Sequence, residues 1–320
     1  MNTESSALPE TFGAQPVVAP ATISPAQRMY WSVRRELWEN RWLYLAPLGV
    51  AAVFLIGFFV STVHLPAAVR RMEIAGTQHQ HDSIGGRLEA HLFAGPYDIA
   101  SSLMMALAIL TGIFYSAEAL HGERSDRSIL FWKSMPVSDT TTVLAKASIA
   151  IVIVPLLVCA VAFVMWWIML LESSLVLLAR GMSPAVLWAQ LPLFQMWGLL
   201  IWHIVTAHAI WPAPIYCWLL LVGGWARRAV VLWAALPVLV IGVLEKLTFN
   251  SWSLAELVGR RLIGDAPSMV VVPGSMSPTN PMTQITAIRF LTSPGLWVGF
   301  LVCALFLIAA IRLRRSRGAI

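Results

Sequence analysis

Six long apolar runs with almost no charged residue constrain this chain more than any other feature. A helix of about 20 residues crosses a bilayer hydrocarbon core of about 30 Å. Each run reaches or approaches that length, so the sequence predicts six transmembrane helices. The runs cover residues 43–63, 99–117, 147–171, 192–225, 229–247 and 294–311. The fourth is longer than one straight crossing and contains Pro212 and Pro214, which predicts a broken or tilted helix.

The overall composition places the protein in the bilayer. Hydrophobic residues make up 58% of the chain and charged residues 12%, and the mean hydropathy is +0.73. Soluble domains carry about 25% charged residues, so this chain cannot cover its apolar surface with polar groups. We predict an all-α integral membrane protein with one membrane domain over residues 25–320. Residues 1–24 contain no Lys or Arg and no apolar core, which predicts a disordered tail.

The basic residues indicate topology rather than a nucleic-acid partner. The net charge is +6, but Lys and Arg flank the apolar runs instead of clustering in one polar domain. With six spans, 14 of the 22 Lys and Arg residues fall on the side that holds both termini. Cytoplasmic connections carry the excess of basic residues, so both termini are predicted to be cytoplasmic.

The segment before the first span, residues 25–42, predicts an amphipathic helix in the membrane interface, with lipid as its partner. Ser24 and Pro25 are typical of a helix start. The alternative is a simple extension of the first span. On a helical wheel the segment has an apolar stripe of Met29, Tyr30, Val33 and Leu37, an opposite polar face of Arg28, Arg35 and Glu39, and a flank of Trp31, Trp38 and Trp42.

The loop at residues 121–140 combines charges with four consecutive apolar residues, Ile129–Trp132. An apolar cluster on the water side of a membrane needs burial, so the loop predicts a protein partner. Pro136 ends this helix, and Ser138 or Asp139 is expected to cap the third span. The predicted contact residues are Glu123, Arg124, Asp126, Arg127, Ile129, Leu130, Phe131 and Lys133.

The run from Glu123 to Lys146, of the form E-R-x-x-R-S-I-L-F-W-K-S-x-P-V-S-D-x-x-x-V-L-x-K, resembles the permease family of type-2 ABC exporters. Residues 34–41 and 218–228 are similar to the same family. The resemblance implies a multi-pass subunit of the bacterial plasma membrane that pairs with a second permease copy and with cytoplasmic ATP-binding subunits. It also implies that loop 121–140 is the coupling helix and residues 25–42 the connecting helix.

ATP chemistry is expected in a separate polypeptide. A phosphate-binding loop needs a Gly-Lys step, whereas Lys133, Lys146 and Lys246 follow Trp, Ala and Glu. We therefore predict no enzyme activity, catalytic residue, cofactor or metal in this chain. The alternatives are a membrane-embedded enzyme acting on lipid, which lacks support from any H-E-x-x-H or G-x-S-x-G motif, or a secondary transporter. The transported substrate stays open.

Ionisable residues and cysteines inside the spans carry weaker predictions. His203 and His208 lie in the fourth run, five residues apart, which separates them by about 140° on an α-helix. Both histidines are candidates either for packing or for a role in a translocation path. Glu118, at the end of the second run, is expected either to be solvated or to form an ion pair with Arg124 or Arg41. The outer-loop residues His79, His81, Asp82 and His91 have irregular spacing for a metal. The three cysteines, Cys159, Cys217 and Cys303, are interpreted as small packing residues.

Overall fold

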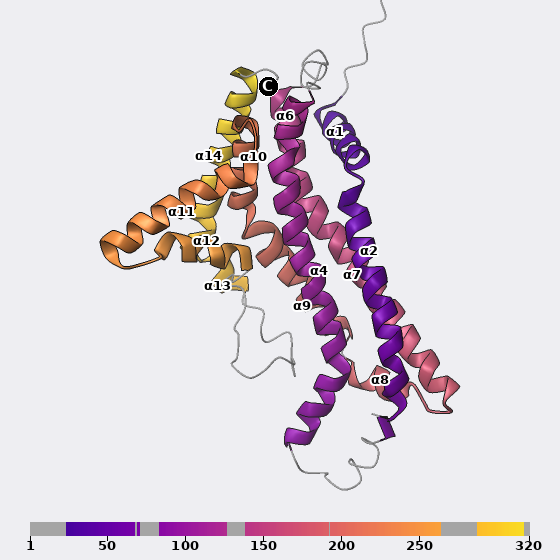
Figure 1. Ribbon diagram of the computed structural model, residues 1–320. Helices are drawn as coiled ribbons and strands as arrows, with labels where there is room; N and C mark the ends of the chain where they lie inside the picture. Colours follow the sequence, from indigo (N-terminus) through magenta and orange to yellow (C-terminus); the bar gives the residue numbers. More distant parts are fainter. Residues whose placement is uncertain are drawn as a thin grey trace, which may run out of the picture.

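The computed structural model describes residues 24–67, 69–70, 83–126, 138–191, 193–263 and 287–316, with side chains omitted at 83–94, 186 and 190. Within these ranges the chain forms helices and no strand (Figure 1). Six helices are long and apolar enough to cross a membrane, as predicted from the six runs. They are Trp42–Ala67, Gly95–Ser125, Asp139–Ala179, Leu193–Trp225, Val230–Phe249 and Pro294–Ser316.

The first helix, α1 (Pro25–Glu39), begins where the sequence predicts. The Ser24 hydroxyl accepts a hydrogen bond from the Gln27 N–H at 3.2 Å, and the Gln27 side chain accepts one from the Ser24 N–H at 3.2 Å. This reciprocal pair satisfies two N–H groups that a helix start otherwise leaves unpaired. The chain then bends at Asn40 and enters α2 (Trp42–Ser61), which the short turn η1 (Thr62–His64) follows.

Two helical units are longer than the apolar runs within them. α4 (Ser83–Ser125) has 43 residues, which corresponds to about 64 Å of helix. The next unit is built from α6 (Asp139–Ser148), the π-helix η2 (Ile149–Ile153) and α7 (Val154–Ala179). The end of α4 and the start of α6 extend past the predicted boundaries, and their polar residues Glu123, Arg124 and Lys146 are buried against neighbouring helices. Ser138 caps α6, since its hydroxyl accepts from the Thr141 N–H at 3.1 Å.

The third and fourth spans each hold a π-helix just before a proline. Proline lacks an N–H and clashes with the carbonyl four residues earlier, so the backbone widens there. In the third span η2 precedes Pro155. In the fourth, α9 (Leu193–His203) continues into η3 (Ile204–Ile210) and then, past Pro212, into α10 (Ala213–Trp225). The prediction of a broken fourth span is confirmed.

α10 packs between α4 and α14 (Pro294–Ser316) at the centre of one half of the molecule (Figure 1). Glycine permits this close packing against α4. A Cβ at Gly223 would lie 2.7 Å from the Ala117 carbonyl oxygen, so any larger residue would push the two backbones apart. The adjacent Gly224 is less constrained, because a Cβ there would meet the flexible Leu313 side chain at 3.4 Å.

The remaining helices lie at the periphery. α8 (Ala185–Gln190) is a short helix between the third and fourth spans. α11 (Val230–Phe249) projects from the bundle and α12 (Ser253–Ile263) folds back along it (Figure 1). Asn250 makes the reversal with a left-handed backbone at φ 54°. α13 (Ala287–Leu291) leads into α14. Most of the α11 surface is exposed, as expected for a helix that contacts lipid.

Candidate functional site

Four helix ends meet at one end of the bundle, where α1, the end of α4, the start of α6 and the end of α14 come together (Figure 1). The residues between α4 and α6 include the predicted coupling loop. Charged side chains from all four helices meet there, either buried or half-buried, and we call them the end cluster. Its members are Arg35, Glu36, Glu123, Asp139, Lys146 and Arg314.

Glu36 and Lys146 form the centre of the end cluster, and their side chains are only 1% and 3% exposed. The Lys146 ammonium lies 2.7 Å from Glu36 Oε1 and 3.1 Å from Glu123 Oε1. Arg35 donates to Glu36 Oε1 at 2.8 Å, and the Tyr115 hydroxyl donates to Glu36 Oε2 at 3.0 Å. Lys146 therefore joins α1 to α4 through carboxylates that approach it from two helices.

Arg314 closes the base of the predicted coupling loop. Its Nη1 donates to Glu123 Oε2, and its Nε donates to Asp139 Oδ1 at 3.0 Å. Glu123 lies near the start of loop 121–140 and Asp139 near its end, so one guanidinium contacts both ends of the segment. The side chain of Arg314 is 4% exposed, which places these charged hydrogen bonds where water competes little.

The end cluster is neutral overall, with three carboxylates against three cations. A buried charge is tolerated only when it is paired and hydrogen-bonded, and each member here meets an opposite charge. Burial alone would raise the pKa of Glu36, but Lys146 and Arg35 outweigh it and lower the pKa below its ordinary value of 4.5. Glu36 is therefore held in its ionised form at neutral pH.

Two of the predicted docking residues point into the protein. Glu123 is buried in the end cluster, and the buried Arg124 donates from Nη1 to the carbonyl oxygens of Gly224 at 2.7 Å and Ala226 at 3.3 Å. These carbonyls lie at the end of α10, where a helix leaves acceptors unpaired and a cation is favourable. Glu123 and Arg124 therefore make contacts within the chain, and their contact with a partner stays a prediction. Asp126 is exposed.

The other predicted docking residues, Arg127, Ile129, Leu130, Phe131 and Lys133, lie outside the described residues. Glu118 is exposed and makes no salt bridge with any residue in the described ranges, which favours the solvated alternative over the ion pair.

The buried face of α1 is more polar than its helical wheel suggested. Val33 and Leu37 pack against apolar residues of α4 and α6, as their stripe predicts, and Met29 is half-buried. Arg35, predicted on the opposite face, instead reaches Glu36 and Glu123. Sequence reasoning missed Glu36. The spacing could have revealed it, because Glu36 follows Val33 by three residues and therefore lies on the same, buried face of the helix.

The exposed face of α1 carries aromatic residues. The Arg34 guanidinium carbon lies 5.1 Å from the ring centroid of Trp31 and 4.9 Å from that of Trp38. Trp38 is 66% exposed and Trp31 56% exposed. A cation stacked between exposed indole rings suits the boundary between lipid and water, where one side of such a residue stays hydrated.

His203 and His208 lie together although an α-helix would separate them. In the π-helix η3, backbone hydrogen bonds join residues five apart, so residues with that spacing lie on the same side of the helix. His203 and His208 have that spacing. Their ring centroids are 5.2 Å apart, and His208 is buried. No group of three metal-ligating side chains occurs in the described part of the chain. His79, His81 and Asp82 lie outside it, as does the side chain of His91.

A second buried cation, Arg261 on α12, has a different environment. Its Nη1 donates to the Trp211 carbonyl at 2.8 Å and its Nη2 to the Gly295 carbonyl at 2.6 Å. Its guanidinium carbon lies 4.5 Å from the Trp211 ring centroid. Burial lowers the pKa of Arg261. Gly299 makes room for this side chain, because a Cβ there would lie 2.8 Å from Arg261 Nη1.

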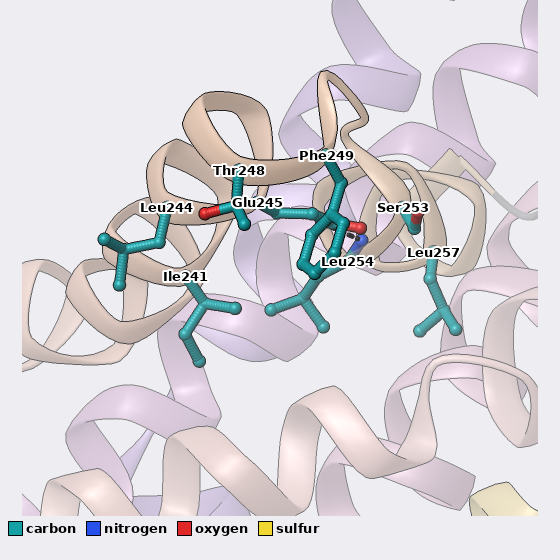
Figure 2. Close-up of a pocket in the computed structure, with 8 residues that line it drawn as sticks. All are labelled: Ile241, Leu244, Glu245, Thr248, Phe249, Ser253, Leu254 and Leu257. Atoms are coloured by element: carbon teal, nitrogen blue, oxygen red, sulfur yellow. Dashed lines mark hydrogen bonds between the residues drawn. The ribbon is translucent and has the colours of Figure 1, made fainter.

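An apolar groove between α11 and α12 offers no comparable chemistry (Figure 2). Its one charged lining residue is Glu245, which accepts from the Ser251 hydroxyl at 2.9 Å and from the Leu254 N–H at 3.1 Å. This carboxylate caps the start of α12. The one carboxylate of the groove is already hydrogen-bonded within the chain, so we take the end cluster, where charged side chains from four helices meet, as the candidate site.

Scans against protein-family models, curated proteins and solved structures find no match to this chain. The six apolar helices indicate a multi-pass membrane protein.

Proposed function

We propose that this protein is the transmembrane subunit of an ATP-driven ABC-type export system. In this proposal the chain pairs with a second permease copy and forms the translocation path in a bacterial plasma membrane. A separate cytoplasmic ATP-binding subunit docks on the loop after the second span. The excess of basic residues on one side supports a cytoplasmic position for both termini, the loop and the end cluster.

The observation that carries the proposal is the anchoring of the predicted coupling loop at both of its ends. Arg314 holds Glu123 on one side of the loop and Asp139 on the other. Through Lys146 the same carboxylate, Glu123, is joined to Glu36 on α1. A displacement of the loop is therefore transmitted directly to α1, α4, α6 and α14. Such a connection suits a loop that receives force from a partner subunit.

Sequence features supply the docking surface and assign ATP hydrolysis to the partner. The apolar residues Ile129, Leu130 and Phe131 favour burial in a protein interface. No lysine of the chain follows a glycine, as a phosphate-binding loop requires. The carboxylates and the lysine of the end cluster are all engaged in ion pairs within the cluster, so these paired charges support a mechanical role more than a catalytic one.

Purification from native membranes tests the proposal. The tagged chain should retain a subunit that contains a G-x-x-x-x-G-K-[ST] loop, and ATP hydrolysis should require that subunit. Phe131→Ala should weaken retention at least thirtyfold, because interface hot spots contribute about 2 kcal/mol or more. The matched control is Asp126→Asn, which removes an exposed charge and should change affinity little.

Three outcomes would contradict the proposal. ATP hydrolysis by the chain alone would place the active site here. Transport driven by an ion gradient, without any ATP-binding subunit, would favour a secondary transporter. Conversion of a lipid by the pure chain would favour a membrane-embedded enzyme.

A further inference from the structure

Two cysteines from different helices lie in direct contact inside the bundle. Cys217 on α10 and Cys303 on α14 place their Sγ atoms 2.8 Å apart, and both are free thiols. Cys217 is fully buried, whereas Cys303 is 8% exposed. Their neighbours are apolar and include Ala213, Ile151 and Phe306. The interpretation of these two cysteines as separate packing residues is therefore incomplete, because only the fold reveals that they meet.

The helices that carry the two thiols are held together on both sides of the contact. Toward the start of both helices, Arg261 donates to the Trp211 carbonyl just before α10 and to the Gly295 carbonyl on α14. Toward their other end, Gly224 of α10 allows the Leu313 side chain of α14 to approach. The thiols are thus kept in reach of each other, and a disulfide with an S–S bond of about 2.05 Å needs only a small further approach.

We propose that Cys217 and Cys303 form an oxidation site whose substrate is a small uncharged peroxide and whose product is a disulfide between α10 and α14. An uncharged oxidant fits this position because it can cross the apolar surroundings that exclude ions. Cys159 on α7 is half-buried and has no such partner among the described residues. The site does not depend on the proposed transport function.

The difference in solvent exposure between Cys303 and Cys217 indicates which thiol reacts first with the peroxide. Cys303 has the accessible surface, so its sulfur attacks one peroxide oxygen, the O–O bond breaks, and a sulfenic acid and one water form. The Cys217 sulfur then attacks the sulfenic sulfur and displaces hydroxide, which leaves with the thiol proton as a second water. In total, two S–H bonds and one O–O bond break, one S–S bond forms, and hydrogen peroxide is reduced to two waters.

The disulfide would bind α10 and α14 covalently near the middle of their contact. It would close a loop between positions 86 residues apart and limit any relative movement of the two helices. We expect the oxidised protein to unfold at a higher temperature than the reduced protein.

The test uses the full chain in lipid nanodiscs, treated with hydrogen peroxide and then with a thiol-blocking reagent under denaturing conditions. We expect two of the three thiols to disappear together and mass spectrometry to identify the Cys217–Cys303 peptide. The Cys159→Ala variant should lose both remaining thiols. Cys217→Ala should accumulate a sulfenic acid at Cys303, which dimedone traps, whereas Cys303→Ala should leave Cys217 reduced.

Retention of all three thiols in the wild-type protein would overturn the proposal, as would selective oxidation of Cys159 or disulfides between separate chains. These thiol measurements are made on the wild-type protein, so they remain valid even if a cysteine variant fails to fold. Dimedone labelling of Cys217 in place of Cys303 would overturn the assigned order of attack.

Discussion

Lys146 and Arg261 are both cations held inside the protein, but their partners differ. Lys146 lies between the carboxylates of Glu36 and Glu123 in a cluster whose charges balance. Arg261 meets two backbone carbonyls and the face of Trp211. The first arrangement joins helices through full opposite charges, and the second joins them through dipoles and a ring.

The two arrangements explain why a lysine suits one position and an arginine the other. An ammonium is a compact point charge, which can approach two carboxylates at 2.7 Å and 3.1 Å from different helices. A guanidinium is planar and weakly hydrated, so its two ends can reach carbonyls on separate segments while its face stacks on an indole. Removing Lys146 leaves a buried carboxylate in excess, whereas removing Arg261 leaves only neutral acceptors.

The largest effect is expected from Lys146→Met. The change leaves the end cluster with three carboxylates and two cations, and breaking a buried ion pair typically costs about 3–5 kcal/mol. Denaturant unfolding of the protein in detergent, followed by tryptophan fluorescence, measures the loss. The control is Glu256→Gln, which breaks the exposed Arg260–Glu256 pair and should cost about 0–1 kcal/mol.

A double variant sharpens this result. Glu36→Gln combined with Lys146→Met restores the balance of charge, so its loss should be smaller than the sum of the single losses. Additive losses would mean that the charges of Glu36 and Lys146 act independently, contrary to their contact.

Arg261→Met should have an intermediate effect, because it removes two charged hydrogen bonds without leaving a charge behind. One hydrogen bond to a charged group contributes about 1.5–3 kcal/mol, and because the guanidinium is only part-buried we expect the two bonds together to contribute about that much in the same unfolding measurement. Gly299→Ala should also destabilise the protein, since the new Cβ would displace the guanidinium. In the Arg261→Met background the glycine change should cost less. An equal loss of stability from Gly299→Ala in both backgrounds would mean that Gly299 does not act by making room for Arg261.

The smallest effect is expected from acid, and it should distinguish the two sites. The folded-state pKa of Glu36 lies below 4.5, so its stabilisation is complete above about pH 4.5 and declines as pH falls through the lower folded value. Unfolding temperatures measured between about pH 6 and pH 3 should fall less in Glu36→Gln than in the wild type. Arg261→Met should keep the wild-type slope, because an arginine does not titrate in this range.

Local patterns in the sequence predicted much of the architecture. Apolar runs with few or no charges located the six long helices of the described ranges, because backbone groups in a bilayer must be satisfied within the helix itself. Ser24, Pro25 and Ser138 marked helix starts through short-range capping. The helix lengths were less predictable. α4 and the α6–α7 unit extend beyond their apolar runs, and at the end of α4 and the start of α6 the polar residues Glu123 and Lys146 are covered by neighbouring helices.

The candidate site was less predictable because its contacts link distant positions. Glu123 was singled out as a partner contact, yet it pairs with Lys146 and with Arg314, which is 191 residues away. Glu36 resembles an ordinary surface residue until α4 and α6 pack over it. The histidines were expected on different sides of a helix, and the π-helix before Pro212 brings them together.

The sequence by itself determined that the chain is helical with six stretches apolar enough to cross a membrane, where capped helices such as α1 begin, and that no lysine follows a glycine. These properties depend on composition and on residues a few positions apart. Only the tertiary structure decided which charges are buried, that Arg314 holds both ends of the loop, and that Cys217 meets Cys303. The physical reason is that a charge or thiol acquires its character from its surroundings, and here those surroundings come from helices far apart in the chain.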